Sequence, residues 1–167
     1  MTATTDRTVR IRVPDLGRRG EGWVALQAIL FVAVVATGFA GPAWAGLARA
    51  IGAVAGLALS AGGAVLIAGG VVGLRRQLTA FPRPVANGQL IEGGAFGLVR
   101  HPMYGGLVLL AVGWGLLTAS VSTLLCALVL GLFFELKSRR EEAWLGEVFP
   151  TYAEYRRRTP RLIPWIY

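Results

Sequence analysis

The chain has 167 residues, of which 54% are hydrophobic and only 16% are charged, and its mean hydropathy is +0.58. The charges gather in a few blocks between long apolar runs, a pattern that excludes an ordinary soluble domain and predicts an all-α integral membrane protein. The formal net charge of +8 does not indicate a nucleic-acid partner, because the basic residues flank the apolar runs, where they suit contact with anionic lipid headgroups.

The first 74 residues divide into a polar tail and two apolar segments. Residues 1–21 are rich in arginine and lack the regular apolar spacing of a packed helix, so we expect a cytoplasmic N-terminal tail. Residues 22–74 contain a single charge, at Arg49, and predict two transmembrane helices over about 22–40 and 47–74, separated at Gly41-Pro42. Glycines recur through the second of these segments and predict close packing against another helix.

Residues 75–167 begin with a polar connection and continue into a helical hairpin. Phe81-Pro82-Arg83-Pro84 and Gly93-Gly94 exclude a continuous helix over residues 75–100. From Pro102 to Phe134 there is no charge, and we expect helices over about 102–117 and 123–136 joined by a tight turn. This helix-turn-helix hairpin brings the predicted number of transmembrane helices to four.

The basic residues predict the orientation of the chain in the membrane. Arginine and lysine cluster before residue 22, between residues 75 and 100 and after residue 136, whereas the hairpin turn has none. The positive-inside rule therefore places the N terminus, the 75–100 connection and the C-terminal segment in the cytoplasm.

Residues 137–167 predict a cytoplasmic helical segment. An apolar and aromatic stripe recurs at every third or fourth position, at Leu145, Phe149, Tyr152 and Tyr155. Pro150 interrupts the stripe and predicts two helices in place of one. Glu141 and Glu142 are adjacent, about 100° apart on a helix, so at most one of them faces a ligand directly while the other pairs with arginine or meets solvent.

Two sequence blocks, in this order, resemble a known family. The first is Arg100-His101-Pro102-Met103-Tyr104-Gly105, and the second starts at Glu141-Glu142, continues through the aromatic stripe and ends with Arg161 and Pro164. Together they resemble the integral membrane methyltransferases typified by isoprenylcysteine carboxyl methyltransferase, a group that also contains phospholipid N-methyltransferases. The resemblance covers residues 81–164, and it marks residues 75–167 as a methyltransferase-like core.

The resemblance implies an S-adenosylmethionine site at the cytoplasmic face with a lateral opening for a lipophilic small molecule or lipidated substrate. The cofactor-binding residues that it implies are Arg100, His101, Tyr104, Gly105, Glu141, Glu142, Tyr152 and Arg161. One of the two glutamates would bind the cofactor amine or ribose, and His101 and Arg161 its carboxylate. Tyr104 or Tyr152 would supply an aromatic face. No residue is assigned a catalytic role and no metal is expected, because methyl transfer chiefly requires alignment of the reacting atoms.

Structural roles for the same residues stay open at this point. Arg100 is equally suited to anchoring a lipid headgroup, and the glutamates are placed to pair with Arg139 and Arg140 along one helix. The single cysteine, Cys126, lies inside an apolar run and is expected to serve packing.

Two other functions also stay open. An NADPH-dependent membrane steroid or sterol reductase shares an Arg-His-Pro element and a C terminus like Pro164 to Tyr167, and a non-enzymatic membrane scaffold would explain the helices alone. For a methyltransferase, the acceptor candidates are an isoprenylcysteine-like carboxylate, a phospholipid amine, a small thiol and an isoprenoid acid. The richness in alanine, glycine and arginine favours a bacterial cell membrane as the location.

Overall fold

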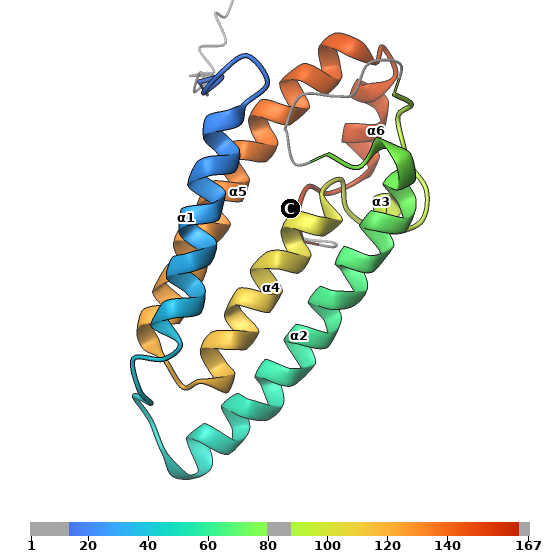
Figure 1. The fold of residues 1–167 in the computed structure, drawn as a ribbon. Helices are drawn as coiled ribbons and strands as arrows, with labels where there is room; N and C mark the ends of the chain where they lie inside the picture. Colours follow the sequence, from blue (N-terminus) through green and yellow to red (C-terminus); the bar gives the residue numbers. More distant parts are fainter. Residues whose placement is uncertain (1–13, 80–87, 164–167) are drawn as a thin grey trace, which may run out of the picture.

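The computed structural model describes residues 14–79 and 88–163, and in that part of the chain the secondary structure is entirely helical (Figure 1). In chain order the helices are α1 (Glu21–Thr37), α2 (Gly46–Leu74), the 3-10 helix η1 (Arg75–Gln77), α3 (Ala95–Leu98), α4 (Pro102–Leu117), α5 (Val121–Val148) and α6 (Tyr152–Arg158). The expected tail before residue 14, the Phe81-Pro82-Arg83-Pro84 connection and the terminal Pro164 to Tyr167 lie outside the described residues.

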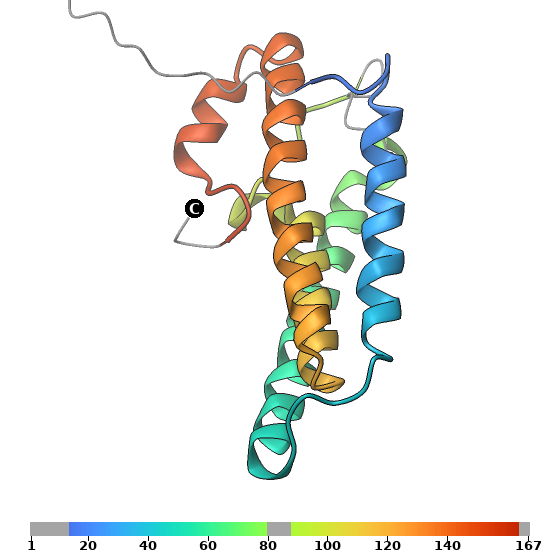
Figure 2. The same ribbon diagram turned by 90° about the vertical axis from the view of Figure 1, so that its left-hand side faces the viewer.

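The four long helices form a layered bundle in which α4 is central. One side of α4 packs against α2 and another against α5, while α1 packs mainly against α5 (Figures 1 and 2). Helices α1 and α2 do not contact each other along their described lengths. The C-terminal half of α5 extends beyond the start of α4, and α6 and α3 lie at that same end of the bundle (Figure 1).

Glycines on facing surfaces set the close approach of α2 and α4. A Cβ added at Gly63 would lie 2.6 Å from the carbonyl oxygen of Gly106, and one added at Gly56 would lie 2.7 Å from that of Gly113. Real Cβ atoms do not come so close to a carbonyl oxygen, so larger residues would push the helices apart. The glycine-rich sequence of the second apolar segment therefore serves helix packing within the chain, as predicted.

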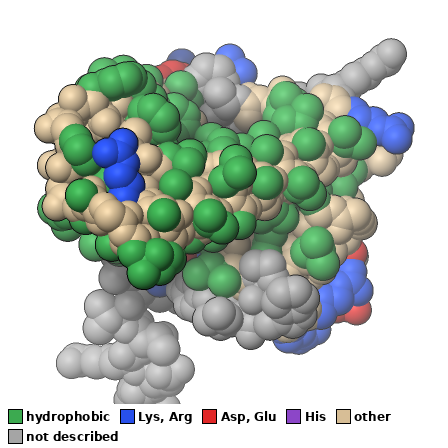
Figure 3. Space-filling model, turned by 90° about the horizontal axis from the view of Figure 1, so that it is seen from below, with side chains coloured by type: hydrophobic (Ala, Val, Ile, Leu, Met, Phe, Trp, Pro, Cys, Tyr) green, Lys and Arg blue, Asp and Glu red, His purple; other side chains and the backbone are tan. Residues whose placement is uncertain are grey.

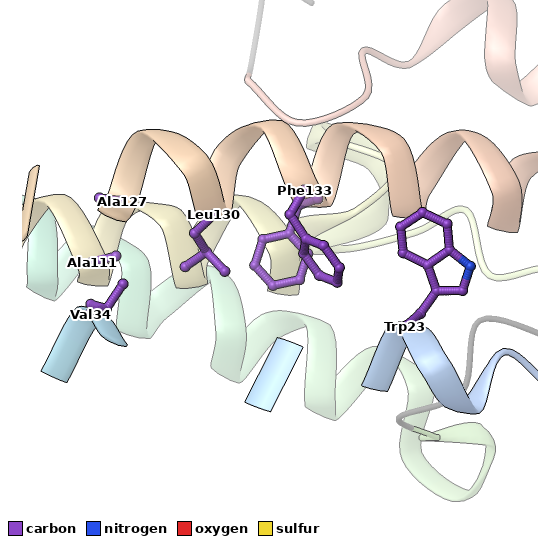
Figure 4. Packing of buried hydrophobic residues seen from close by; sticks show 7 residues of the cluster. Trp23, Val34, Ala111, Ala127, Leu130 and Phe133 are labelled. Atoms are coloured by element: carbon purple, nitrogen blue, oxygen red, sulfur yellow. The ribbon is translucent and has the colours of Figure 1, made fainter. Parts of the chain in front are cut away.

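The apolar core lies mainly between α1, α4 and α5. Its buried members are Trp23, Val34, Ala111, Ala127, Leu130, Phe133 and Phe134 (Figure 4). The rings of Trp23 and Phe133 meet at 5.6 Å between centroids, which fastens the start of α1 to the middle of α5. Aromatic pairs at this separation add about 0.5–1.5 kcal/mol to the gain from area burial.

The prediction of a helix ending near residue 136 is wrong, because α5 continues without a break from Val121 to Val148. The change from apolar to charged residues at that point suggested a boundary, but helical hydrogen bonding does not depend on side-chain polarity. No proline or glycine stands there, and the Arg139 side chain pairs with Glu135 one turn earlier at 2.5 Å. The expected break at Pro150 is confirmed, since α5 ends at Val148 and α6 begins at Tyr152.

Polar contacts join the turn between α4 and α5 to the end of α1. The side chain of Ser120 caps α5 by accepting a hydrogen bond from the Thr123 amide at 3.2 Å, and its hydroxyl donates to the Thr37 carbonyl at 2.9 Å. The Thr37 and Thr123 hydroxyls also lie 3.1 Å apart. These contacts tie the end of α1 to the start of α5.

The outer helix surfaces suit a hydrocarbon environment. Large apolar side chains are widely exposed on α1, α2 and α5, among them Val32, Leu47 and Leu128 at 68%, 76% and 61% exposure. Green apolar side chains cover much of the molecule seen from below, and basic groups appear at a few places only (Figure 3). Helices α2 and α5 have the length and hydropathy to cross a membrane, whereas α1 and α4 are shorter apolar helices. The structure thus supports a membrane protein, and the four crossings and their orientation stay predictions.

Candidate functional site

The C-terminal segment folds back onto the start of α4 through backbone hydrogen bonds. The Arg100 amide donates to the Pro160 carbonyl at 2.9 Å, and the His101 amide donates to the Arg161 carbonyl at 3.1 Å. Gly105 allows the segment to pass, because a Cβ there would lie 2.8 Å from the Leu162 carbonyl oxygen. The two sequence blocks singled out above are therefore in direct contact.

Glu142 lies at the centre of a buried charge cluster. Its Oε1 accepts hydrogen bonds from Arg100 Nε at 2.9 Å and from Arg161 Nε at 3.0 Å, and it lies 3.3 Å from His101 Nε2. Arg161 also reaches Glu142 Oε2 at 3.2 Å. A carboxylate that is only 5% exposed requires such partners, because an isolated buried charge is very costly. We call Glu142, Arg100, His101 and Arg161 the Glu142 cluster.

Further contacts satisfy the remaining hydrogen-bond donors of the two arginines of the cluster. Arg161 Nη1 pairs with Glu135 at 2.5 Å. Arg100 Nη1 donates to the carbonyl oxygens of Arg156, at 3.0 Å, and Thr159. The cluster therefore holds α5, the segment before α4 and the chain that follows α6 in one arrangement.

Glu141 points to a different environment from its neighbour. Its Oε2 accepts a hydrogen bond from the Tyr104 hydroxyl at 2.8 Å and lies 3.8 Å from His101 Nδ1. The rings of His101 and Tyr104 are stacked with centroids 5.3 Å apart, and Tyr104 stacks in turn on Phe134 at 4.6 Å. The two glutamate side chains thus point in different directions, as expected for adjacent positions on a helix. Glu142 pairs with arginines, while Glu141 faces His101 and Tyr104.

A cavity of about 560 Å³ lies beside these residues, within the size range of small-molecule sites. Its polar lining includes Arg100, His101, Tyr104, Lys137, Glu141 and Tyr152. Its apolar lining includes Leu74, Phe96, Met103, Leu107, Leu145 and Phe149. Glu142, Gly105 and Arg161 do not line the cavity, and they form the layer that supports its wall.

Two buried tyrosines of α6 differ in their hydrogen bonding. The Tyr155 hydroxyl donates to the Phe96 carbonyl at 2.6 Å, which fixes α6 against α3. The Tyr152 hydroxyl is buried beside the cavity and has no hydrogen-bond partner among the described residues. Burial raises the pKa of both phenols well above its ordinary value, so both hydroxyls stay protonated near neutral pH. Tyr152 therefore offers an unused hydrogen-bond donor at the wall.

Sequence reasoning missed two polar residues of the cavity. Lys137 on α5 is 1% exposed, and its Nζ donates to Gln27 Oε1 on α1 at 2.5 Å. Both residues also line the cavity. The four-residue spacing from Lys137 to Glu141, which places both side chains on one helical face, is the signal that could have identified the lysine.

No metal centre is evident in the part of the chain that the structure describes. Within residues 14–79 and 88–163, no three His, Cys, Asp or Glu side chains come together in a group that could hold an ion.

Comparison with curated proteins gives partial matches. The chain is 42% identical over 79 residues to the protein-S-isoprenylcysteine O-methyltransferase of Schizosaccharomyces pombe. It is 38% identical over 79 residues to the cobalt-zinc-cadmium resistance protein CzcN of Cupriavidus metallidurans, and 32% identical over 77 residues to the nickel-cobalt-cadmium resistance protein NccN of Alcaligenes xylosoxydans xylosoxydans. These alignments cover 46% or 47% of this chain and only 34% to 37% of the relatives.

A family profile gives the broader match. The phospholipid methyltransferase profile matches residues 51–152, a region that starts inside α2 and contains His101 and both glutamates. This match covers more than half of the chain and favours a methyltransferase over a reductase. The chain belongs to the phospholipid methyltransferase family, and the family points to a membrane methyltransferase of the isoprenylcysteine and phospholipid type.

Proposed function

We propose that the protein transfers a methyl group from S-adenosylmethionine to a lipophilic acceptor that reaches the site from the membrane. The observation that carries this proposal is the cavity whose walls combine the His101 block with the Glu141 to Tyr155 block. Those two blocks belong to the region that resembles membrane methyltransferases, and they meet through the Glu142 cluster.

The donor set of the cavity fits S-adenosylmethionine. The cofactor carries an amine, a carboxylate, ribose hydroxyls, an adenine ring and a cationic sulfur. Glu141 offers a carboxylate to the amine and the cationic sulfur of the cofactor. Tyr152 offers a buried hydroxyl that has no hydrogen-bond partner within the described chain. Aromatic and aliphatic side chains such as Phe149, Leu145 and Phe96 offer apolar surface to the adenine.

The site residues divide between binding and positioning. We assign His101, Tyr104, Glu141 and Tyr152 to cofactor binding, with Arg100 at the edge of the same wall. The positioning residues are Glu142, Arg161 and Gly105, which do not line the cavity. They hold the C-terminal segment against the start of α4 and so fix the positions of the binding residues. When bound, S-adenosylmethionine supplies an electrophilic methyl carbon, and the protein contributes alignment and exclusion of water.

Access from the membrane is part of the proposal. The cavity lining includes Gln27 of α1 and Leu74 of α2, two helices that do not contact each other in the described chain. Their outer faces carry exposed apolar side chains, which suits a lipid-facing entrance between them. We propose that this end of the bundle, which holds the N-terminal end of α1 and the C-terminal helix α6, is cytoplasmic and that the membrane is that of a bacterial cell.

The names of the relative and of the family suggest two classes of methyl acceptor. The Schizosaccharomyces pombe relative is named as an isoprenylcysteine O-methyltransferase, but this chain covers only 34% of it. A prenyl-like tail would suit the apolar entrance, and the phospholipid name of the family keeps a lipid amine as the second acceptor class.

Transfer of labelled methyl from S-adenosylmethionine to a membrane lipid extract tests the proposal. Wild type and the control Glu147→Gln, whose side chain is exposed on α5, are expected to label lipid equally. His101→Ala and Glu141→Gln are expected to lose at least about tenfold in rate, because each removes a polar group from the cavity wall. Equal labelling by all four proteins, or none by the wild type, would reject the site.

A further inference from the structure

Arg140 lies where the exposed apolar surface of α5 ends. Large apolar side chains recur along one face of this helix at Leu128, Leu132 and Leu136, which are 61%, 59% and 41% exposed. Arg140 follows Leu136 by four residues, so it continues the same face one turn farther toward the charged end of the helix. Because α5 has the length and hydropathy to cross a membrane, this turn is at the level expected for lipid headgroups.

An aromatic ring holds the Arg140 guanidinium in place. The central carbon of the guanidinium lies 4.1 Å from the centre of the Trp144 ring, one turn along α5, in a cation–π contact. Trp144 is 5% exposed and the Arg140 side chain 17% exposed. The guanidinium is therefore an oriented, partly buried cation, which has less freedom to lose on binding an anion than an ordinary surface arginine.

The carboxylate that pairs with Arg140 belongs to the segment before α1. Arg140 Nη2 forms an ion pair with Asp15, where this segment reaches the C-terminal half of α5 (Figure 2). The Asp15 side chain is 61% exposed, and an ion pair so open to water contributes little to stability. Arg140 Nε is buried and has no hydrogen-bond partner within the described chain. The guanidinium edge that carries Nε and Nη2 is thus only partly satisfied.

We propose that Arg140, oriented by Trp144, binds the phosphate of an anionic phospholipid headgroup, and that Asp15 takes its place when no lipid is bound. A phosphate has the charge and the acceptor oxygens to bind Nε and Nη2 together. The acyl chains of such a lipid would lie along the exposed leucines of α5, which begin directly beside Arg140. That apolar surface favours a lipid over a free phosphate ion.

The site is separate from the proposed methyl transfer. Arg140, Trp144 and Asp15 do not line the cavity. Asp15 and a lipid phosphate are both anionic and cannot share one guanidinium edge, so they compete for it. Removing the Asp15 charge should therefore strengthen lipid binding, whereas removing the Arg140 charge should weaken it. Opposite effects from the two partners of one ion pair distinguish an exchangeable site from a purely structural pair.

Lipid binding to the full chain in a neutral detergent, measured by native mass spectrometry, tests the proposal. The probes are dioleoylphosphatidylglycerol, inorganic phosphate and dioleoylphosphatidylcholine, whose choline cation offsets the phosphate charge. We expect the wild type to bind phosphatidylglycerol about fivefold more tightly than phosphatidylcholine, the factor that one arginine near anionic headgroups supplies. Arg140→Met should lose this preference, and Asp15→Asn should bind phosphatidylglycerol about threefold more tightly than the wild type.

Arg139→Met is the matched control, because it removes the same charge from a neighbouring arginine that pairs with Glu135. It should change the affinity for phosphatidylglycerol by less than about twofold.

Each outcome bears on the proposal. A selective loss in Arg140→Met together with a gain in Asp15→Asn supports it. Equal wild-type affinity for the two lipids overturns it, and that comparison needs no variant to fold. Equal losses in Arg139→Met and Arg140→Met also overturn it, because they indicate attraction to the overall surface charge. Unchanged or weaker binding in Asp15→Asn excludes the exchange, and inorganic phosphate that binds as tightly as phosphatidylglycerol excludes the lipid as the specific ligand.

Discussion

Neutralising Glu142 should destabilise the fold as well as the site. Glu142→Gln keeps the shape of the side chain but removes the negative charge that four basic groups share: the other three members of the Glu142 cluster and Arg156, whose Nε lies 3.8 Å from Oε2. The side chains of Arg100 and Arg161 are only 7% and 9% exposed, so water cannot replace the lost carboxylate. Breaking a buried ion pair by removing one partner costs about 3–5 kcal/mol. Because Arg161 keeps Glu135 as a second partner, we expect about 3 kcal/mol, the lower end of that range.

Reversible denaturation of the purified protein in detergent measures this loss. Glu147→Gln is the matched control, since it makes the same chemical change on an exposed position of the same helix and should alter stability by no more than about 0.5 kcal/mol. Glu141→Gln should fall between the two, because Glu141 is partly exposed and accepts one hydrogen bond from Tyr104. If Glu142→Gln unfolds at the same denaturant concentration as the control, the Glu142 cluster does not hold the C-terminal segment.

Two further substitutions have controls within the chain. Gly63→Ala should lower stability by about 1–3 kcal/mol, because its Cβ would meet the Gly106 carbonyl oxygen at 2.6 Å, while Gly62→Ala faces open space and should be neutral or stabilising. Similar denaturation curves for both would contradict the α2–α4 packing. Tyr152→Phe should weaken S-adenosylmethionine binding several-fold without loss of stability, because its hydroxyl has no partner in the described chain. Tyr155→Phe should lose about 1 kcal/mol of stability with its hydrogen bond to α3, and a reversed pattern in the two tyrosines would be incompatible with this assignment.

The helix positions could be predicted because their signals are local. Uncharged runs, the break at Gly41-Pro42 and the proline at position 102 define α1, α2 and α4 close to their observed bounds. The length of α5 could not be predicted in this way. The sequence becomes charged after Leu136, and such a change usually marks the end of a transmembrane segment. The helix nevertheless continues, because charged side chains leave its backbone hydrogen bonds intact.

The family resemblance predicted that the two site blocks form one site. The different contacts that Glu141 and Glu142 make within that site could be seen only in the structure. The helical phase required that Glu141 and Glu142 differ in direction, but only the return of the chain past Arg161 shows which of them meets the arginines. The Gln27–Lys137 pair joins positions 110 residues apart, so no local pattern could reveal it.

Equilibrium titration of the purified wild-type protein with S-adenosylmethionine and, separately, with NADPH distinguishes a methyltransferase from a reductase. We expect saturable binding of S-adenosylmethionine that weakens in Glu141→Gln and Tyr152→Phe, because both side chains line the cavity, and no comparable binding of NADPH. Saturable NADPH binding without S-adenosylmethionine binding would refute the methyltransferase function, and S-adenosylmethionine binding that neither substitution affects would refute the proposed site.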